Sequence, residues 1–352
     1  MKKKILIGAM SAILAIPMTA SAVQVAGKTL EIYGKLHVSV DATDNDRVTP
    51  NDESDFTLST NSSRLGFKGK HKIGNSDLTV VYKLEQQIDI GLSGGTALNT
   101  RNTYVGLKGS FGQVIAGYHD TPFKTVASKW GVFGDTVGER RALLGAKSTG
   151  GNTMNQRAKN MLMWSNKFGN MKAMVMYSGN TGTRTGNDYD TMKSVGLLYK
   201  GKGTPFYFGA AYEDWDSLKG SATDGYRIMG GYKASFGKIG LIYEDISSND
   251  TTLNRSAFGI NGVVKLGSGL DLRGQILIAD DSAAGANTGA TMTTLGLYKK
   301  LDKKTKLYAV YTQMDNDSNA KYQGVDGGHG VEVKTDSGAT PTAFSLGMIY
   351  KF

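Results

Sequence analysis

The chain has 352 residues, no cysteine, 47 glycines, only 5 prolines and a formal net charge of +10. The lack of cysteine excludes disulfides, iron–sulfur clusters and cysteine-ligated zinc. The positive charges are spread along the chain and do not form one basic cluster, which argues against nucleic acid as a partner.

The first 22 residues have the pattern of a secretory signal peptide. A basic head at 1–4 precedes an apolar stretch at 5–18, and Ala-Ser-Ala at 20–22 has small residues at the cleavage positions. The apolar stretch is too short for a transmembrane helix, which needs ~20 apolar residues. We therefore expect residues 1–22 to be removed on secretion, leaving residues 23–352 as the mature protein.

Alternating segments follow the leader and recur to the end of the chain. The first, Leu30 to Asp41, alternates apolar and polar residues with a period of two, which indicates a β-strand with one apolar face. Sixteen such segments are bounded by turn residues and predict an all-β protein. They lie near residues 30–41, 56–71, 78–85, 99–108, just after 112, 155–168, 170–179, 191–200, 205–215, 225–235, 239–247, 254–266, 270–280, 290–300, 304–314 and 341–352.

The connections between these segments alternate in length. The short ones lie near 169–170, 201–203, 236–238, 267–269 and 302–303. The long polar ones lie near 43–55, 91–98, 121–154, 180–190, 216–224, 248–253, 281–289 and 315–340. Short turns at one end and long loops at the other are typical of an antiparallel transmembrane β-barrel, with the turns in the periplasm. An even number of strands also predicts that both termini are periplasmic.

The two faces of the segments favour a barrel in lipid over a soluble β-sandwich. One face is apolar and the other carries Lys, Arg, Glu and Thr, whereas the outer faces of a sandwich would be polar. The last segment is apolar at every second residue from Phe344 to Phe352. Aromatic residues near the segment ends predict two interface girdles: Tyr82, Phe111, Trp164, Phe168, Tyr177, Tyr199, Tyr232, Phe236, Tyr243, Tyr298, Tyr350 and Phe352.

Four motifs give the chain a family resemblance. They are Glu-Ile-Tyr-Gly-Lys at 31–35, Ser-Arg-Leu-Gly-Phe-Lys-Gly at 63–69, Arg-x4-Gly-Leu-Lys-Gly-Ser-Phe-Gly at 101–112 and Tyr-Lys-Phe at 350–352. With them, the mature chain resembles the sixteen-stranded trimeric general porins of Gram-negative bacteria. The resemblance implies a homotrimer in the outer membrane, in contact with lipid and lipopolysaccharide. It also implies a water-filled pore for small hydrophilic solutes and ions, narrowed by an inward-folded third long loop.

The resemblance also suggests which residues line the pore constriction. By motif position, the basic wall corresponds to Lys35, Arg64, Arg101 and Arg157. All four lie on the inward-facing phase of their predicted strands, independently of the family. Glu85, on the inward face of the third segment, corresponds to the acid that accompanies the arginines.

The third long loop, 121–154, is the candidate for the acidic side of the constriction. Asp135 and Glu139 are its candidate acids. The loop departs from enterobacterial relatives, because Val132 stands where they carry a glutamate and arginines are added at 140–141. These changes favour a shift toward anions.

Three functions remain open on the sequence: a general diffusion porin, a substrate- or anion-selective channel with a basic constriction, and an outer-membrane enzyme or adhesin. The chain offers no convergent nucleophile and base, so we expect no enzyme activity. A G-x-S-x-G match at 91–95 lies in a loop without the strand and helix that a catalytic serine needs. The four histidines, which show no metal-ligand spacing, give no reason to expect a metal or other cofactor: His37, His71, His119 and His329.

Overall fold

The computed structural model describes residues 23–24, 29–47, 54–91, 98–146, 153–182, 184–185, 188–201, 203–218, 220–325, 328–330 and 332–352. The predicted signal peptide lies outside these residues, as does most of the G-x-S-x-G match. In the described part of the chain, no helix is both long enough and apolar enough to cross a membrane.

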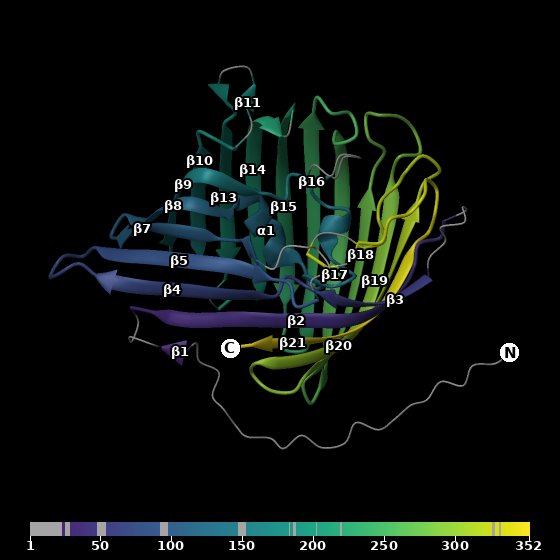
Figure 1. The fold of residues 1–352 in the computed structure, drawn as a ribbon, viewed down its shortest axis with the longest axis horizontal. Helices are drawn as coiled ribbons and strands as arrows, with labels where there is room; N and C mark the ends of the chain where they lie inside the picture. Colours follow the sequence, from purple (N-terminus) through teal and green to yellow (C-terminus); the bar gives the residue numbers. More distant parts are fainter. Residues whose placement is uncertain are drawn as a thin grey trace.

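Sixteen antiparallel strands form a closed barrel within the described residues, as the sequence predicted. Each strand pairs with its neighbour in the chain, and the first (β2) pairs with the last (β21) to close the sheet (Figure 1). Two of the sixteen are each divided into two shorter strands, β3 with β4 and β6 with β7. The strands are β2 (Glu31–Asp44), β3 (Ser54–Thr60), β4 (Arg64–Lys72), β5 (Thr79–Ile88), β6 (Leu98–Thr100), β7 (Thr103–Gly109), β8 (Gly112–Asp120), β9 (Arg157–Phe168), β10 (Met171–Ser178), β13 (Met192–Lys200), β14 (Phe206–Leu218), β15 (Ser221–Lys233), β16 (Gly237–Ser248), β17 (Arg255–Gly267), β18 (Leu270–Ala279), β19 (Ala290–Lys300), β20 (Thr305–Asn316) and β21 (Thr342–Lys351).

The closing seam brings the terminal aromatic residue onto the first strand. The backbone N–H of Gly34 donates to the carbonyl oxygen of Phe352 at 3.0 Å, and the N–H of Phe352 donates back at 3.2 Å. A Cβ atom at Gly34 would collide with the Phe352 ring. The glycine of the first-strand motif is therefore needed for the close approach of the last residue.

Smaller elements complete the chain. β1 (Val23–Gln24) pairs with β2, and β11 (Arg184–Thr185) pairs with β12 (Asp188–Tyr189) in a small hairpin. The connection between β8 and β9 contains helix α1 (Pro122–Trp130) and a 3-10 turn, η1 (Arg140–Ala142).

The outer surface of the barrel is apolar along the whole circuit. Large exposed hydrophobic side chains recur on the outward phase of most strands, for example Phe67, Val105, Val175, Leu197, Ile228, Leu241, Phe258, Ile276, Leu295 and Leu346. Such a surface belongs in lipid. One predicted girdle residue is wrong: Tyr298 is only 3% exposed and stacks on Tyr308, with centroids 5.3 Å apart, on the opposite face of the sheet. Its place near a strand end suggested the girdle, but its phase along β19 turns it away from lipid.

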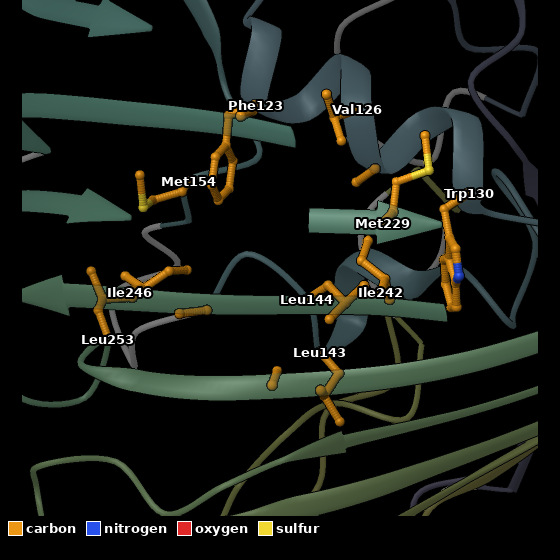
Figure 2. Close-up of a cluster of buried hydrophobic side chains, with 14 of the residues drawn as sticks. Phe123, Val126, Trp130, Leu143, Leu144, Met154, Met229, Ile242, Ile246 and Leu253 are labelled. Atoms are coloured by element: carbon orange, nitrogen blue, oxygen red, sulfur yellow. The ribbon is translucent and has the colours of Figure 1, made fainter. Parts of the chain in front are cut away.

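The inner surface is not polar throughout, as the alternation alone would suggest. Helix α1 begins where the Thr121 hydroxyl accepts a hydrogen bond from the N–H of Lys124 at 3.2 Å, with Pro122 in the first turn. Its apolar side chains pack against β13 to β16 in a buried cluster with Leu143 and Leu144 (Figure 2). The strand residues of this cluster include Met192, Ala211, Met229, Ile242 and Ile246. One sector of the inner wall is therefore apolar because the segment after β8 covers it.

The cost of a charge on the outer face should depend on its depth. Leu295 lies in the middle of β19, and Leu307 lies near the short-turn end of β20. We expect Leu295→Arg to lower the free energy of unfolding by about 2–4 kcal/mol, and Leu307→Arg by about 0–1 kcal/mol, since an arginine near the interface reaches water. Denaturant titration of the barrel refolded in phospholipid vesicles measures both. Equal costs would contradict a lipid-facing outer surface.

Candidate functional site

The predicted basic wall is assembled where the strand ladders are interrupted. Lys35 on β2 lies directly opposite Arg64, the first residue after the break between β3 and β4. Arg101 occupies the break between β6 and β7, and Arg157 is the first residue of β9. Interruptions of a ladder can re-aim side chains beside a functional site. The structure thus brings the four predicted cations to one side of the inner wall.

Asp135 from the connection after β8 meets this wall. Its carboxylate lies 2.7 Å from the Lys35 ammonium, 3.5 Å from the Arg64 guanidinium and 3.1 Å from that of Arg141. Burial opposes ionisation, but the positive charges of Lys35, Arg141 and Arg64 hold the pKa of Asp135 well below its usual range. Asp135 is therefore a carboxylate held among three cations.

Glu85 forms a second group within the same wall. It accepts a hydrogen bond from the Tyr33 hydroxyl at 2.8 Å and forms ion pairs with Lys83 at 3.0 Å and Arg101 at 3.1 Å. Arg101 also donates to the Gln87 side-chain oxygen at 2.9 Å. The predicted partnership of Glu85 with the arginines is present as geometry, whereas its role in a pore stays a prediction.

Asp120 is a carboxylate that the sequence reasoning missed. It lies at the end of β8, 3.2 Å from Arg157 and 3.0 Å from Lys124 of α1. Burial lowers the pKa of Lys124 to about 8, with Asp120 acting in the opposite direction. The position of Asp120 on a strand end could have suggested it, but its partner Lys124 belongs to a helix that the strand pattern does not reveal.

Glu139, the second candidate acid, makes its described bonds within its own segment, and its role on the acidic side of a pore stays a prediction. It is 1% exposed, and its bonds stay within its own segment: Arg140 at 2.8 Å, Arg141 at 3.1 Å and the N–H of Asp135 at 2.6 Å. Burial opposes ionisation, but Arg141 and Arg140 lower the pKa of Glu139 to about 2. A lowered folded-state pKa means that these pairs stabilise the protein at neutral pH, and this stabilisation declines as the pH falls from about 4 through about 2.

Cations outnumber acids in this cluster. Every carboxylate has at least two cationic partners. The cluster contains eight cations, Lys35, Arg64, Lys83, Arg101, Lys124, Arg140, Arg141 and Arg157, and four carboxylates, Glu85, Asp120, Asp135 and Glu139. The formal excess is four positive charges.

Side chains of β15 to β18 anchor the segment that carries Asp135. Arg227 donates to the Phe123 carbonyl at 3.0 Å, Asn261 to the Trp130 carbonyl at 3.0 Å and Arg273 to the Val132 carbonyl at 2.8 Å. Three more bonds extend the set: Arg255 to Leu143, Gln275 to Gly138, and the Gly145 N–H to Glu244, which also binds Arg227 at 2.8 Å. Their inward phase is readable in the sequence, but their partners are not. Among the described residues, no group of histidines and acids could hold a metal ion.

A closed barrel with an apolar outside and charged groups inside defines a transmembrane β-barrel protein. The family model described as Gram-negative porin matches residues 9–319 of the chain. The chain therefore belongs to the Gram-negative porin family, which places it in the outer membrane.

Individual relatives are distant. Over 178 residues, 48% of this chain and 49% of the relative, the chain is 26% identical to the major outer membrane protein P.IB of Neisseria meningitidis. The match thus spans about half the length of that relative. The anion-selective porin from Comamonas acidovorans superposes with a TM-score of 0.76 and 20% identity over 92% of this chain and 99% of that one. The trimer form of OmpT from Vibrio cholerae superposes with a TM-score of 0.69 and 17% identity, over 92% of this chain and 99% of that one. These two likenesses concern the fold.

Removing the Glu139 carboxylate charge should loosen the segment. Glu139→Gln removes the buried carboxylate that pairs with both Arg140 and Arg141, and should make local opening of the segment easier by about 1–3 kcal/mol. We expect trypsin to cleave after these arginines about tenfold faster, because proteolysis follows the population of the opened form. Glu31→Gln, which removes a more exposed partner of Lys68, is the control. An unchanged cleavage rate in Glu139→Gln would refute the anchoring role.

Proposed function

We propose that this chain forms a water-filled channel through which small hydrophilic solutes and ions diffuse passively across the outer membrane. The observation that carries the proposal is the charged cluster on the inner wall, with Asp135 held against Lys35 and Arg64. Passive diffusion needs no catalytic group, and we expect no enzyme activity and no cofactor.

The proposed constriction lies between the segment 121–146 and the basic wall. Charges around a narrow aperture with low-dielectric walls set the local potential by several kT. Opposite charges facing across the aperture also orient water. An apolar solute must disrupt that water, so the channel should favour polar cargo. In this proposal Lys35, Arg64, Arg101 and Arg157 line one side and the segment lines the other, and the two sides meet where Asp135 pairs with Lys35.

A preference for anions is the second part of the proposal. The cluster has an excess of four positive charges, and each of its carboxylates also has cationic partners. In this proposal Glu139, which pairs with Arg140 and Arg141, contributes less negative charge to the aperture than Asp135 does. The structural relative from Comamonas is named as anion-selective, which agrees with this direction.

Assembly and topology complete the proposal. We propose a homotrimer, in line with the trimer form of the Vibrio relative. The short turns and both termini would lie in the periplasm, and the outer face would contact lipid and lipopolysaccharide. Residues 1–22 would be cleaved as a signal peptide, so that the intact mass of protein isolated from an outer membrane should correspond to a chain beginning at Val23.

The channel itself is tested by single-channel recording. The mature chain, refolded and added to planar bilayers, should give conductance in three equal steps that rises roughly linearly with salt, as expected of three parallel water-filled pores. A single step per insertion would contradict the trimer. No conductance from correctly folded protein would overturn the channel.

The basic wall is tested by reversal potentials in a KCl gradient. Arg64→Gln with Arg101→Gln should lower the chloride-to-potassium permeability ratio about threefold or more, because the wall contributes to a potential of several kT. Asp135→Asn should raise the ratio. Lys70→Gln with Lys300→Gln removes the same charge from lysines outside the cluster and should have a smaller effect. Equal effects of the two double variants would argue against a localised filter.

A further inference from the structure

A second basic site lies apart from the constriction, at the short-turn end of the barrel. Six lysines line a cavity of about 720 Å³ there, a size typical of pockets for small molecules. One lysine is in the last turn of α1 and the others are on β9, β10, β13, β15 and β16. They are Lys129, Lys167, Lys172, Lys200, Lys233 and Lys238.

Four of the lysines face each other as like-charged pairs on neighbouring strands, an unfavourable arrangement in an antiparallel sheet. Lys167 lies directly opposite Lys172 on β9 and β10, and Lys233 lies directly opposite Lys238 on β15 and β16. Like charges in this position destabilise an antiparallel pair. Lys129 lines the same cavity as Lys172 and adds a further positive charge there. Local rules broken without a compensating contact are expected at functional sites.

Nothing in the described part of the chain neutralises these charges. Each cation on the basic wall described above has a carboxylate partner, whereas none of the six lysines takes part in a described ion pair. Lys238 donates to the Trp130 carbonyl at 3.3 Å, which is a weak, uncharged acceptor. The cavity therefore holds an uncompensated concentration of positive charge.

The cavity lies at the rim of the barrel, where outer-face residues such as Met171 and Phe206 also line it, but its lysines face the lumen. Lys167, Lys233 and Lys238 lie on the inward phase of their strands and are at least partly exposed. The residues next to them, Phe168, Tyr232 and Ile239, are exposed apolar side chains of the opposite, outer face. Because these lysines lie on the inward phase, a soluble anion that enters from the lumen is the occupant they favour.

We propose that this lysine cluster is a saturable binding site for soluble multivalent anions, such as small solutes that carry several phosphate or carboxylate groups. A multivalent anion can accept charge-assisted hydrogen bonds from several ammonium groups at once and relieve the repulsion between opposed lysines. A monovalent ion such as chloride cannot bridge them. The site goes beyond the proposed diffusion function, and rests on it only in requiring a lumen that solutes can enter.

Calorimetric titration of the full mature protein with inorganic tripolyphosphate at low salt tests the site. Lys172→Gln with Lys238→Gln should weaken binding roughly tenfold or more, since the loss of charge-assisted hydrogen bonds changes the dissociation constant by at least that factor. Both substitutions remove a repulsion, so the variant should fold. Lys70→Gln with Lys300→Gln, inward-phase lysines of the same barrel end outside the cavity, is the matched control and should change affinity less than about twofold. Citrate in place of tripolyphosphate compares carboxylate with phosphate.

Several results would overturn the inference. They are absent binding of both anions to the wild type, equal losses in the two lysine variants, or a loss in Arg64→Gln as large as in Lys172→Gln with Lys238→Gln. Conductance in KCl, recorded on the same preparation, separates this site from the proposed channel. A conducting protein that binds neither anion refutes the lysine site alone. A protein that binds tripolyphosphate but does not conduct refutes the channel alone.

Discussion

The arrangement of the inner wall depends on hydrogen bonds between strand side chains and the backbone of the segment after β8. Backbone carbonyls of a segment that leaves regular structure must find donors once they are buried. Arg227, Asn261 and Arg273 supply them from β15, β17 and β18. Glu244 in turn neutralises Arg227, which would otherwise be a buried, unpaired cation. These polar bonds hold α1 above the apolar cluster of Met229 and Ile242 shown in Figure 2.

This anchoring makes the inner wall asymmetric. In one sector the segment covers the wall and accepts hydrogen bonds from its polar side chains. The opposite sector, on β2, β4 and the β6–β7 break, carries the basic side chains. Asp135 is the point at which the anchored segment meets that sector, and it brings one negative charge to Lys35 and Arg64. Because Glu139 forms ion pairs with Arg140 and Arg141, the segment adds little further negative charge there. In the proposed channel, the field across the aperture would therefore depend on how the segment is held as well as on which acids it contains.

The barrel could be predicted closely from the sequence, but the segment within it could not. Period-two alternation is a local property, so it identified the sixteen strands, their inward phase and the basic residues on it. The partners of Glu139, Asp120 and Arg227 depend on contacts between residues far apart in the chain, which no local pattern encodes. Tyr298 shows a smaller failure, since proximity to a strand end was given more weight than its phase.

The two basic regions of the inner wall differ in whether their positive charges are paired with carboxylates. In the charged cluster around Asp135 each carboxylate joins two or more cations, so these charges stabilise the geometry of the cluster. In the lysine cavity, opposed Lys167 and Lys172 repel each other with no described acid between them. A barrel can accept this cost because closed backbone ladders in lipid, not side-chain pairs at the rim, hold it together. An anion that bridges the lysines would remove their mutual repulsion, and the free energy of that repulsion would add to the binding free energy.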